Sequence, residues 1–120
     1  MERWNIIPDF PTYSVSSWGN VRHDISSKRF AGKLLKGIKN REGYLQVTLY
    51  RNGIPTSKLV HLLVAHAFVP NPDDHPIVLH LDDNKANPRA DNLVWGTHSS
   101  NAIMALLATA AKLVRAKYKP

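Results

Sequence analysis

Hydrophobic and polar residues alternate strictly from residue 43 to residue 50, and this period of two predicts a half-buried β-strand. Asn52 and Gly53 follow, and this pair favours the positive φ values of a tight hairpin turn. The pattern therefore predicts a hairpin whose second strand includes residues 57–60. The two faces of the first strand carry Leu45, Val47 and Leu49 on one side and Tyr44, Gln46, Thr48 and Tyr50 on the other.

The chain before this hairpin also predicts short strands. Residues 13–16 and 21–25 are separated by Ser17-Trp18-Gly19-Asn20, which is typical of a turn. Residues 26–41 are polar and basic and include no acidic residue, so we expect an exposed loop or irregular strand there.

Helical spacing begins at residue 60. Apolar residues share one helical stripe from residue 60 to 68, and the Pro-Asn-Pro run at 70–72 ends the predicted helix. Short apolar runs at 77–79 and 93–95 enclose a polar loop at 82–91, which predicts strand, loop, strand. A terminal amphipathic helix is expected from apolar residues at three- and four-residue spacings: Ile103, Leu106, Leu107, Ala110, Leu113 and Val114.

Length and composition exclude several classes of protein. A chain of 120 residues has room for one modest core, and the lack of cysteine excludes a disulfide scaffold, thiol catalysis and a cysteine-based zinc finger. No apolar run approaches the roughly 18 residues of a membrane span, and the first residues do not form a signal peptide. We therefore expect a cytoplasmic protein with no membrane segment.

Charge is unevenly distributed along the chain. The formal net charge is +7, which favours a polyanionic partner such as nucleic acid. Residues 1–60 hold ten basic and four acidic residues (+6), residues 61–100 hold two and five (−3), and residues 101–120 hold four and none (+4). Five of the six histidines lie in the negative middle segment. This distribution is typical of a metal-dependent site between two surfaces that grip a phosphate backbone.

The basic residues provide the candidate DNA contacts. Most of them lie in the polar stretch before the hairpin, and two lie in the terminal helix, where they also suit the negative end of the helix dipole. The candidates are Arg22, Lys28, Arg29, Lys33, Lys36, Lys39, Arg41, Lys112 and Arg115.

Polar residues mark a specific arrangement in the second half of the chain. His80 ends the first strand, Asn92 begins the second, and Asn101 lies in the first turn of the terminal helix. With the Val60-His61 helix, this strand, loop, strand, helix order resembles the ββα-metal unit of HNH nucleases. The first part, from Trp4 through residues 7–16 and 19–22, resembles the small β module that often precedes HNH homing endonucleases of phages.

The resemblance implies hydrolysis of a DNA phosphodiester by one divalent metal ion and one histidine. His80 corresponds to the general base, and its unperturbed pKa near 6.5 suits removal of a proton from water. Asn92 corresponds to the residue that orients the base. Asn101 corresponds to a metal ligand, and its amide oxygen suits Mg²⁺ or Mn²⁺.

Two positions depart from the family pattern. Leu79 stands where a metal ligand commonly precedes the base histidine, and Ala105 stands where the helix often provides a second ligand. Asp82 or Asp83 could replace the missing donor. The first alternative is therefore an HNH-fold protein that binds DNA without cutting it, and the second is a protein-interaction module that uses the terminal helix.

These patterns together predict an α+β protein with two parts. Residues 1–56 are expected to form a basic, DNA-contacting β module, and residues 57–120 are expected to form the HNH nuclease core with its terminal helix. The expected partner is double-stranded DNA. Because the chain ends at Pro120, few sequence-reading contacts are expected, with weak specificity or a homodimer as the two consequences.

Overall fold

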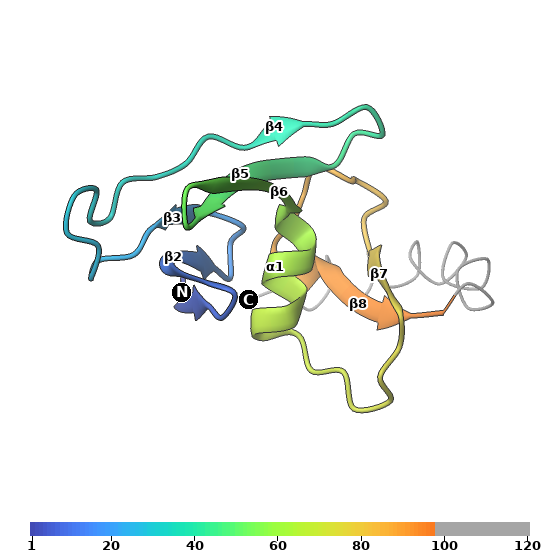
Figure 1. The fold of residues 1–120 in the computed structure, drawn as a ribbon. Coiled ribbons are helices and arrows are strands. Elements are labelled where there is room, and N and C mark those ends of the chain that lie inside the picture. The colour runs from blue at the N-terminus through green and yellow to red at the C-terminus, as the bar shows by residue number, and fades with distance from the viewer. Residues whose placement is uncertain (98–120) are drawn as a thin grey trace.

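The computed structural model describes residues 1–97, which form three small antiparallel sheets around one α-helix (Figure 1). The strand orders are β1-β2-β3, β4-β5-β6 and β7-β8. The elements are β1 (Trp4–Ile7), β2 (Phe10–Ser16), β3 (Val21–His23), β4 (Ile38–Lys39), β5 (Leu45–Arg51), β6 (Ile54–Leu59), α1 (Val60–Phe68), β7 (Ile77–His80), a 3₁₀ turn (Ala90–Asn92) and β8 (Leu93–Gly96). The predicted terminal helix lies outside the described residues.

The predicted central hairpin is confirmed as β5 and β6. These strands pair up to Arg51 and Ile54, and the two turn residues have the expected positive φ values, 52° at Asn52 and 77° at Gly53. The alternation also holds, since Val47 and Leu49 are buried. β5 therefore places one apolar face on the core.

The first sheet differs from the prediction at both ends. The sequence pattern does not predict β1, because the Trp4–Ile7 segment shows no clear alternation, yet this segment pairs with β2. The predicted strand over 21–25 ends at His23, since the Asp24 carboxylate accepts a hydrogen bond from the Ser26 amide (3.1 Å) and turns the chain.

Helix α1 is central to the described fold. It follows β6 directly (Figure 1) and contacts strands from all three sheets. Val64 and Ala65 are completely buried on its inner face. The Trp95 indole of β8 donates a hydrogen bond to the carbonyl of Val69 just after the helix (3.0 Å). One continuous core results, and it joins residues of all three sheets to the helix: Ile7, Phe10, Tyr13, Val15, Val21, Val47, Leu49, Val60, Val64, Ala65 and Leu93.

The basic stretch between β3 and β5 has little regular structure, as predicted. It contains only the short strand β4 and an isolated bridge between Arg22 and Leu34. In Figure 1 it runs in an extended path along the outer edge of the second sheet. Its exposed position leaves its cations available to a partner.

Candidate active site

His80 lies where β7 ends, on the β7-β8 hairpin. It is paired with Leu93, the first residue of β8. Its ring contacts that of His61 from α1, with ring centroids 4.9 Å apart, and that of Tyr44, which precedes β5, at 5.8 Å. Tyr44 in turn stacks on His61 at 4.9 Å. Three segments far apart in sequence thus surround the histidine with aromatic rings.

Burial lowers the pKa of both imidazoles of this cluster. His61 is only 6% exposed, and burial, with a smaller contribution from His80, lowers its pKa to about 4. Burial also lowers the pKa of His80, while the carboxylates of Asp82 and Asp83 raise it and the ammonium of Lys85 lowers it. The lowered pKa of His80 favours the neutral ring, which is the form that accepts a proton.

Two imidazole nitrogens of the cluster lack a polar contact with the described residues. Nδ1 of His61 and Nε2 of His80 are buried and have no hydrogen-bond partner among residues 1–97. Buried polar atoms usually have such a partner, so an orphaned nitrogen requires an explanation.

Asn92 ties the two ends of the polar loop together. It is 1% exposed, and its side-chain oxygen accepts a hydrogen bond from the amide of Asp82 (3.0 Å). Its side-chain nitrogen donates to the Asp82 carboxylate (2.9 Å) and to the carbonyl of Asn87 (3.0 Å). Its own carbonyl accepts from the amide of Leu81 (2.8 Å), directly after His80. Asn92 thus fixes the backbone beside the histidine.

The rest of the loop is held by short-range side-chain bonds. The Asp82 carboxylate also accepts from the amide of Asn84 (2.8 Å) and the side chain of Asn87 (2.8 Å), and Asn84 accepts from the amide of Ala86 (3.0 Å). Asp83 adopts a φ of 59°, a left-handed conformation that Asp tolerates better than most residues. These bonds show loop closure, the structural role of Asx residues in turns.

This geometry agrees with the similarity of the chain to known proteins. Residues 2–50 match the NUMOD4 motif, and residues 58–103, which include His80, Asn92 and Asn101, match the HNH endonuclease family. The chain contains an HNH endonuclease domain preceded by a NUMOD4 motif.

Individual relatives agree with both matches. The chain is 36% identical over 115 residues to the uncharacterized HNH endonuclease L245 of Acanthamoeba polyphaga mimivirus, covering 96% of this chain and 33% of that protein. It is 35% identical over 105 residues to the H-N-H endonuclease F-TflII of Escherichia phage T5, covering 86% and 52%. It thus spans between a third and about half of the length of these relatives.

A solved structure shows the same fold. The chain superposes on the HNH homing endonuclease I-HmuI, whose structure is described as showing DNA binding and cleavage, with a TM-score of 0.74. The sequences are 29% identical, and the superposition covers 94% of this chain and 66% of that one. The α+β arrangement of small antiparallel sheets and one helix is therefore that of an HNH endonuclease.

Few metal-binding side chains gather near His80 within residues 1–97. No group of three or more His, Cys, Asp or Glu residues within 1–97 could hold an ion. Leu79 has no donor atom, and both Asp82 carboxylate oxygens are engaged by loop amides and amide side chains. Asn101, the predicted ligand, lies outside the described residues.

The predicted DNA-binding residues fall into three groups. Arg22 is half-buried, and its guanidinium lies 3.8 Å from the centre of the Trp4 ring, so it is engaged within the protein. Lys112 and Arg115 lie outside the described residues. The remaining candidates lie along the stretch between β3 and β5, where they are largely exposed: Lys28, Arg29, Lys33, Lys36, Lys39 and Arg41.

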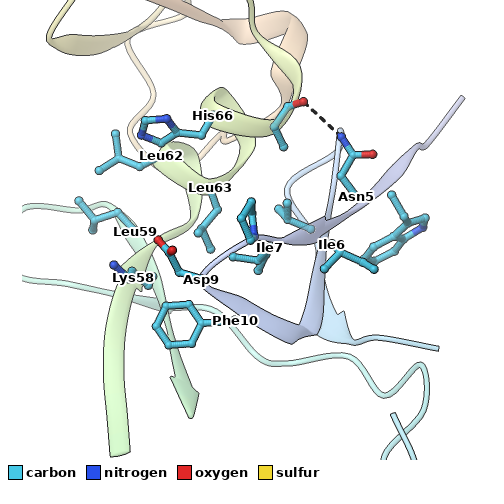
Figure 2. Close-up of a pocket in the computed structure, with 14 residues that line it drawn as sticks. Asn5, Ile6, Ile7, Asp9, Phe10, Lys58, Leu59, Leu62, Leu63 and His66 are labelled. Atoms are coloured by element: carbon cyan, nitrogen blue, oxygen red, sulfur yellow. Dashed lines mark hydrogen bonds between the residues drawn. The ribbon is translucent and has the colours of Figure 1, made fainter. Parts of the chain in front are cut away.

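A separate apolar cavity of about 860 Å³ lies between the first sheet and α1 (Figure 2). Ile7 and Phe10 line it from the sheet, and Leu62 and Leu63 line it from the helix. Asn5 closes one side by donating a hydrogen bond to the carbonyl of Ala67 (3.2 Å), drawn as a dashed line in Figure 2. None of the three rings of the His80 cluster lines this cavity.

Sequence reasoning misses part of the His80 environment. Alternation assigns Tyr44 to the outward face of the strand, but its ring packs against His61 and His80. For His61 the sequence favours packing or a hydrogen bond over metal binding, and in the structure His61 lies in the core against Tyr44. The signal that could have found Tyr44 is its place just before β5, where Gly43 (φ 93°) takes the chain out of the strand pattern.

No helix within residues 1–97 is long and apolar enough to span a bilayer.

Proposed function

We propose that this chain is a DNA endonuclease that hydrolyses phosphodiester bonds with His80 as general base. The observation that carries the proposal is the position of His80 at the end of β7, next to the loop that Asn92 crosslinks, within the segment that matches the HNH endonuclease family. The similarity to F-TflII and I-HmuI, both named as endonucleases, supports the same activity.

The environment of His80 suits proton transfer. A base removes a proton from water most effectively when its pKa lies near or below the working pH, because it is then present in its deprotonated form. Burial against His61 and Tyr44 lowers the pKa of His80 and restricts its ring. In the proposed reaction, neutral His80 takes a proton from the water that attacks phosphorus, the bond between phosphorus and the leaving oxygen breaks, and the leaving oxygen takes a proton from solvent water.

Asn92 acts on this reaction through the backbone. Its side-chain bonds end at Asp82 and Asn87, and its carbonyl holds the amide of Leu81. We infer that Asn92 orients His80 by fixing the residues that follow it. A positioned base gains rate because its reactive atom stays near the attacking water.

Metal dependence belongs to the proposal and rests on Asn101. A divalent ion, Mg²⁺ or Mn²⁺, bound there together with the scissile phosphate and water would neutralise charge on the phosphate and the leaving oxygen. With few protein ligands, such an ion would bind tightly only when DNA is present.

Double-stranded DNA is the proposed partner. The lysines and arginines between β3 and β5 would contact phosphates, with Lys112 and Arg115 adding to them from the carboxy-terminal segment. In this proposal residues 1–56 grip the backbone and residues 57–120 carry the chemistry.

The test is cleavage of duplex DNA by purified protein with Mg²⁺, with Mn²⁺ and with chelator. We expect cleavage only with a divalent ion, and loss of cleavage in His80→Ala. The matched control is His75→Ala, because His75 is a loop histidine whose contacts are with Asn71 and Asp73, outside the His80 cluster. Cleavage by His80→Ala at the wild-type rate would overturn the assignment.

A second candidate is an HNH-fold protein that binds DNA without cutting it. The observation that favours it is Leu79, which lies on β7 opposite Val94 and provides no metal-binding atom next to His80. This candidate predicts salt-sensitive DNA binding without nicking, and metal-dependent cleavage created by Leu79→Asp. Efficient cleavage by the unaltered protein would exclude it.

A further inference from the structure

A turn of the NUMOD4 motif packs directly on the loop of the HNH domain. Ser17, Trp18 and Gly19 belong to the turn that connects β2 to β3, and they contact the segment from Pro88 to Ala90. The two segments belong to different family matches, residues 2–50 and 58–103. The contact is therefore made between a module expected to bind DNA and the loop next to the proposed general base.

Three contacts of different kinds form this junction. The amide of Ala90 donates a hydrogen bond to the carbonyl of Ser17 (2.9 Å). The guanidinium of Arg89 lies 5.0 Å from the centre of the Trp18 ring. Gly19 lies so close to Pro88 that a Cβ atom at Gly19 would be 2.4 Å from the Pro88 Cγ.

The turn has its own internal support. The Ser16 hydroxyl accepts hydrogen bonds from the amides of Trp18 (3.2 Å) and Asn20 (3.0 Å). The Ser17 hydroxyl accepts from the amide of Arg3 (3.0 Å), and the Ser17 amide donates to the Arg3 carbonyl (2.8 Å). These bonds anchor the turn to the start of β1, so it presents a fixed surface to the loop.

Two backbone hydrogen bonds connect the contacted segment, Pro88 to Ala90, with the residue that follows His80. The amide of Asn92 donates a hydrogen bond to the carbonyl of Arg89 (2.9 Å), which links the residues that contact the turn to Asn92. Asn92 then holds Leu81, the residue after His80, through its carbonyl. A displacement at Pro88 would therefore reach the backbone beside the base through hydrogen bonds present in the structure.

We propose that the Ser17–Gly19 turn is a positioning element for the nuclease loop, so that the NUMOD4 motif sets the rate of cleavage and does more than bind DNA. This inference rests on the proposed nuclease function of His80. Gly19 is its most specific residue, because its φ of 89° and the contact with Pro88 both require the absence of a side chain.

The test compares Gly19→Ala with Gly53→Ala. Gly53 has a similar positive φ of 77°, but a Cβ there meets no atom within 4 Å, so it reproduces the backbone strain without the contact. Single-turnover cleavage at saturating DNA and DNA affinity are measured separately. We expect Gly19→Ala to cleave at least about tenfold more slowly with affinity within about twofold of wild type, because misplacement of a catalytic group affects the chemical step. Gly53→Ala should cleave at nearly the wild-type rate.

A double variant that removes the steric contact with Pro88 provides a second test. In Gly19→Ala/Pro88→Ala the atom nearest to the new methyl group is gone, and the next contact would be at 3.2 Å. We expect this double variant to recover much of the rate that Gly19→Ala loses. Should Gly19→Ala fail to fold, Trp18→Leu replaces it, since Trp18 is 43% exposed and its substitution removes the indole that lies against Arg89.

Two results would overturn the inference. One is an equal loss of rate in Gly19→Ala and Gly53→Ala, and the other is a loss of DNA affinity in Gly19→Ala with the rate at saturation unchanged. If Trp18→Leu is used, a single-turnover cleavage rate equal to that of the wild type would also overturn the inference. Absence of cleavage by the unaltered protein would instead contradict the proposed function, so the two failures are distinguishable.

Discussion

His80 combines two conditions that a general base requires, a neutral ring and a fixed position. The neutral ring follows from burial, which lowers its pKa. The fixed position follows from the rings of His61 and Tyr44 on one side and the Asn92-bonded backbone on the other. Neighbouring carboxylates raise the pKa of His80 and a neighbouring ammonium lowers it, so substitutions of these groups should change the pH dependence of cleavage.

Two substitutions should move the pH dependence of cleavage in opposite directions. The Lys85 ammonium lowers the pKa of His80 and the Asp83 carboxylate raises it. Because the neutral form is active, the rate rises as pH increases through this pKa and then levels off. Lys85→Gln should move the rise to higher pH, and Asp83→Asn should move it to lower pH. Single-turnover rates between about pH 4.5 and 8 measure both.

Asn is a suitable replacement at position 83, because it tolerates the positive φ found there. Arg41→Gln is the matched control for Lys85→Gln in loss of positive charge, since Arg41 is not among the groups that affect the pKa of His80. Movement of both profiles in the same direction would contradict the assignment of the rise to His80.

His61 should make the protein less stable at acidic pH. Its pKa is about 4 in the folded chain and near 6.5 in the unfolded chain, so the unfolded state binds the proton more strongly. The stability that the folded state gains from keeping His61 neutral is fully present above about pH 6.5, and it is lost as the pH falls toward 4. In His61→Phe, which keeps a ring at this position, the fall in unfolding free energy across this range should be smaller by the order of 1–2 kcal/mol. Urea unfolding at several pH values measures it, and an unchanged pH dependence would contradict the account.

Sequence reasoning succeeds at residues whose role is local in sequence. The Asn52-Gly53 turn and the place of His80 at the end of a strand follow from neighbouring residues. The contacts of Tyr44 with His61 and His80 depend on how three distant segments meet, and the alternation of polar residues carries no signal for that. The alternation therefore assigns Tyr44 to the wrong environment.

The loop between β7 and β8 behaves as one element because Asn92 crosslinks it. Asn92→Ala would leave the amide of Asp82 and the carbonyl of Asn87 without their buried partner. We expect the free energy of unfolding to fall by about 2–4 kcal/mol and cleavage to fall by roughly tenfold or more.

Asn84→Ala is the matched control in the same loop. Asn84 is exposed, and its side chain accepts one bond from the amide of Ala86. Its removal should cost less than about 1 kcal/mol, because water replaces this bond. Equal effects of the two substitutions on thermal unfolding and on cleavage would show that Asn92 has no special role.

Most elements can be predicted, and the exceptions have physical causes. The hairpin, α1 and the β7-β8 pair follow from alternation, helical spacing and bounding turns. β1 could not be predicted, because its own residues do not alternate between apolar and polar and the strand is stabilised by pairing with β2. The junction of Gly19 with Pro88 could not be predicted, since no local pattern encodes a contact between residues 69 positions apart.

The charge distribution is a property of the whole molecule. Six cations between β3 and β5 lie on one extended segment, whereas the polar loop at 82–91 carries three acidic residues, Asp82, Asp83 and Asp91, against two basic ones, Lys85 and Arg89. A polyanion would be attracted to the first region more strongly than to the second. This arrangement agrees with the proposal that the amino-terminal half holds DNA and that the chemistry takes place in the second half.

Neutralising part of this segment should reduce the salt dependence of DNA binding. In Lys33→Gln/Lys36→Gln, the slope of log affinity against log salt should become shallower by up to about 0.9 for each DNA phosphate that a lysine no longer neutralises. Lys58→Gln is the control, because Lys58 lies over the Phe10 ring beside the apolar cavity. Slopes equal to that of wild type in the double variant would exclude a role for these lysines.

The central claim is that His80 removes a proton during DNA hydrolysis. Its most direct test is the single-turnover cleavage rate of His80→Ala at saturating DNA and divalent ion, with and without added imidazole. The account predicts a rate about 10²–10⁴-fold below wild type that rises with the concentration of neutral imidazole. A His80→Ala protein that cleaves at the wild-type rate without imidazole would contradict it.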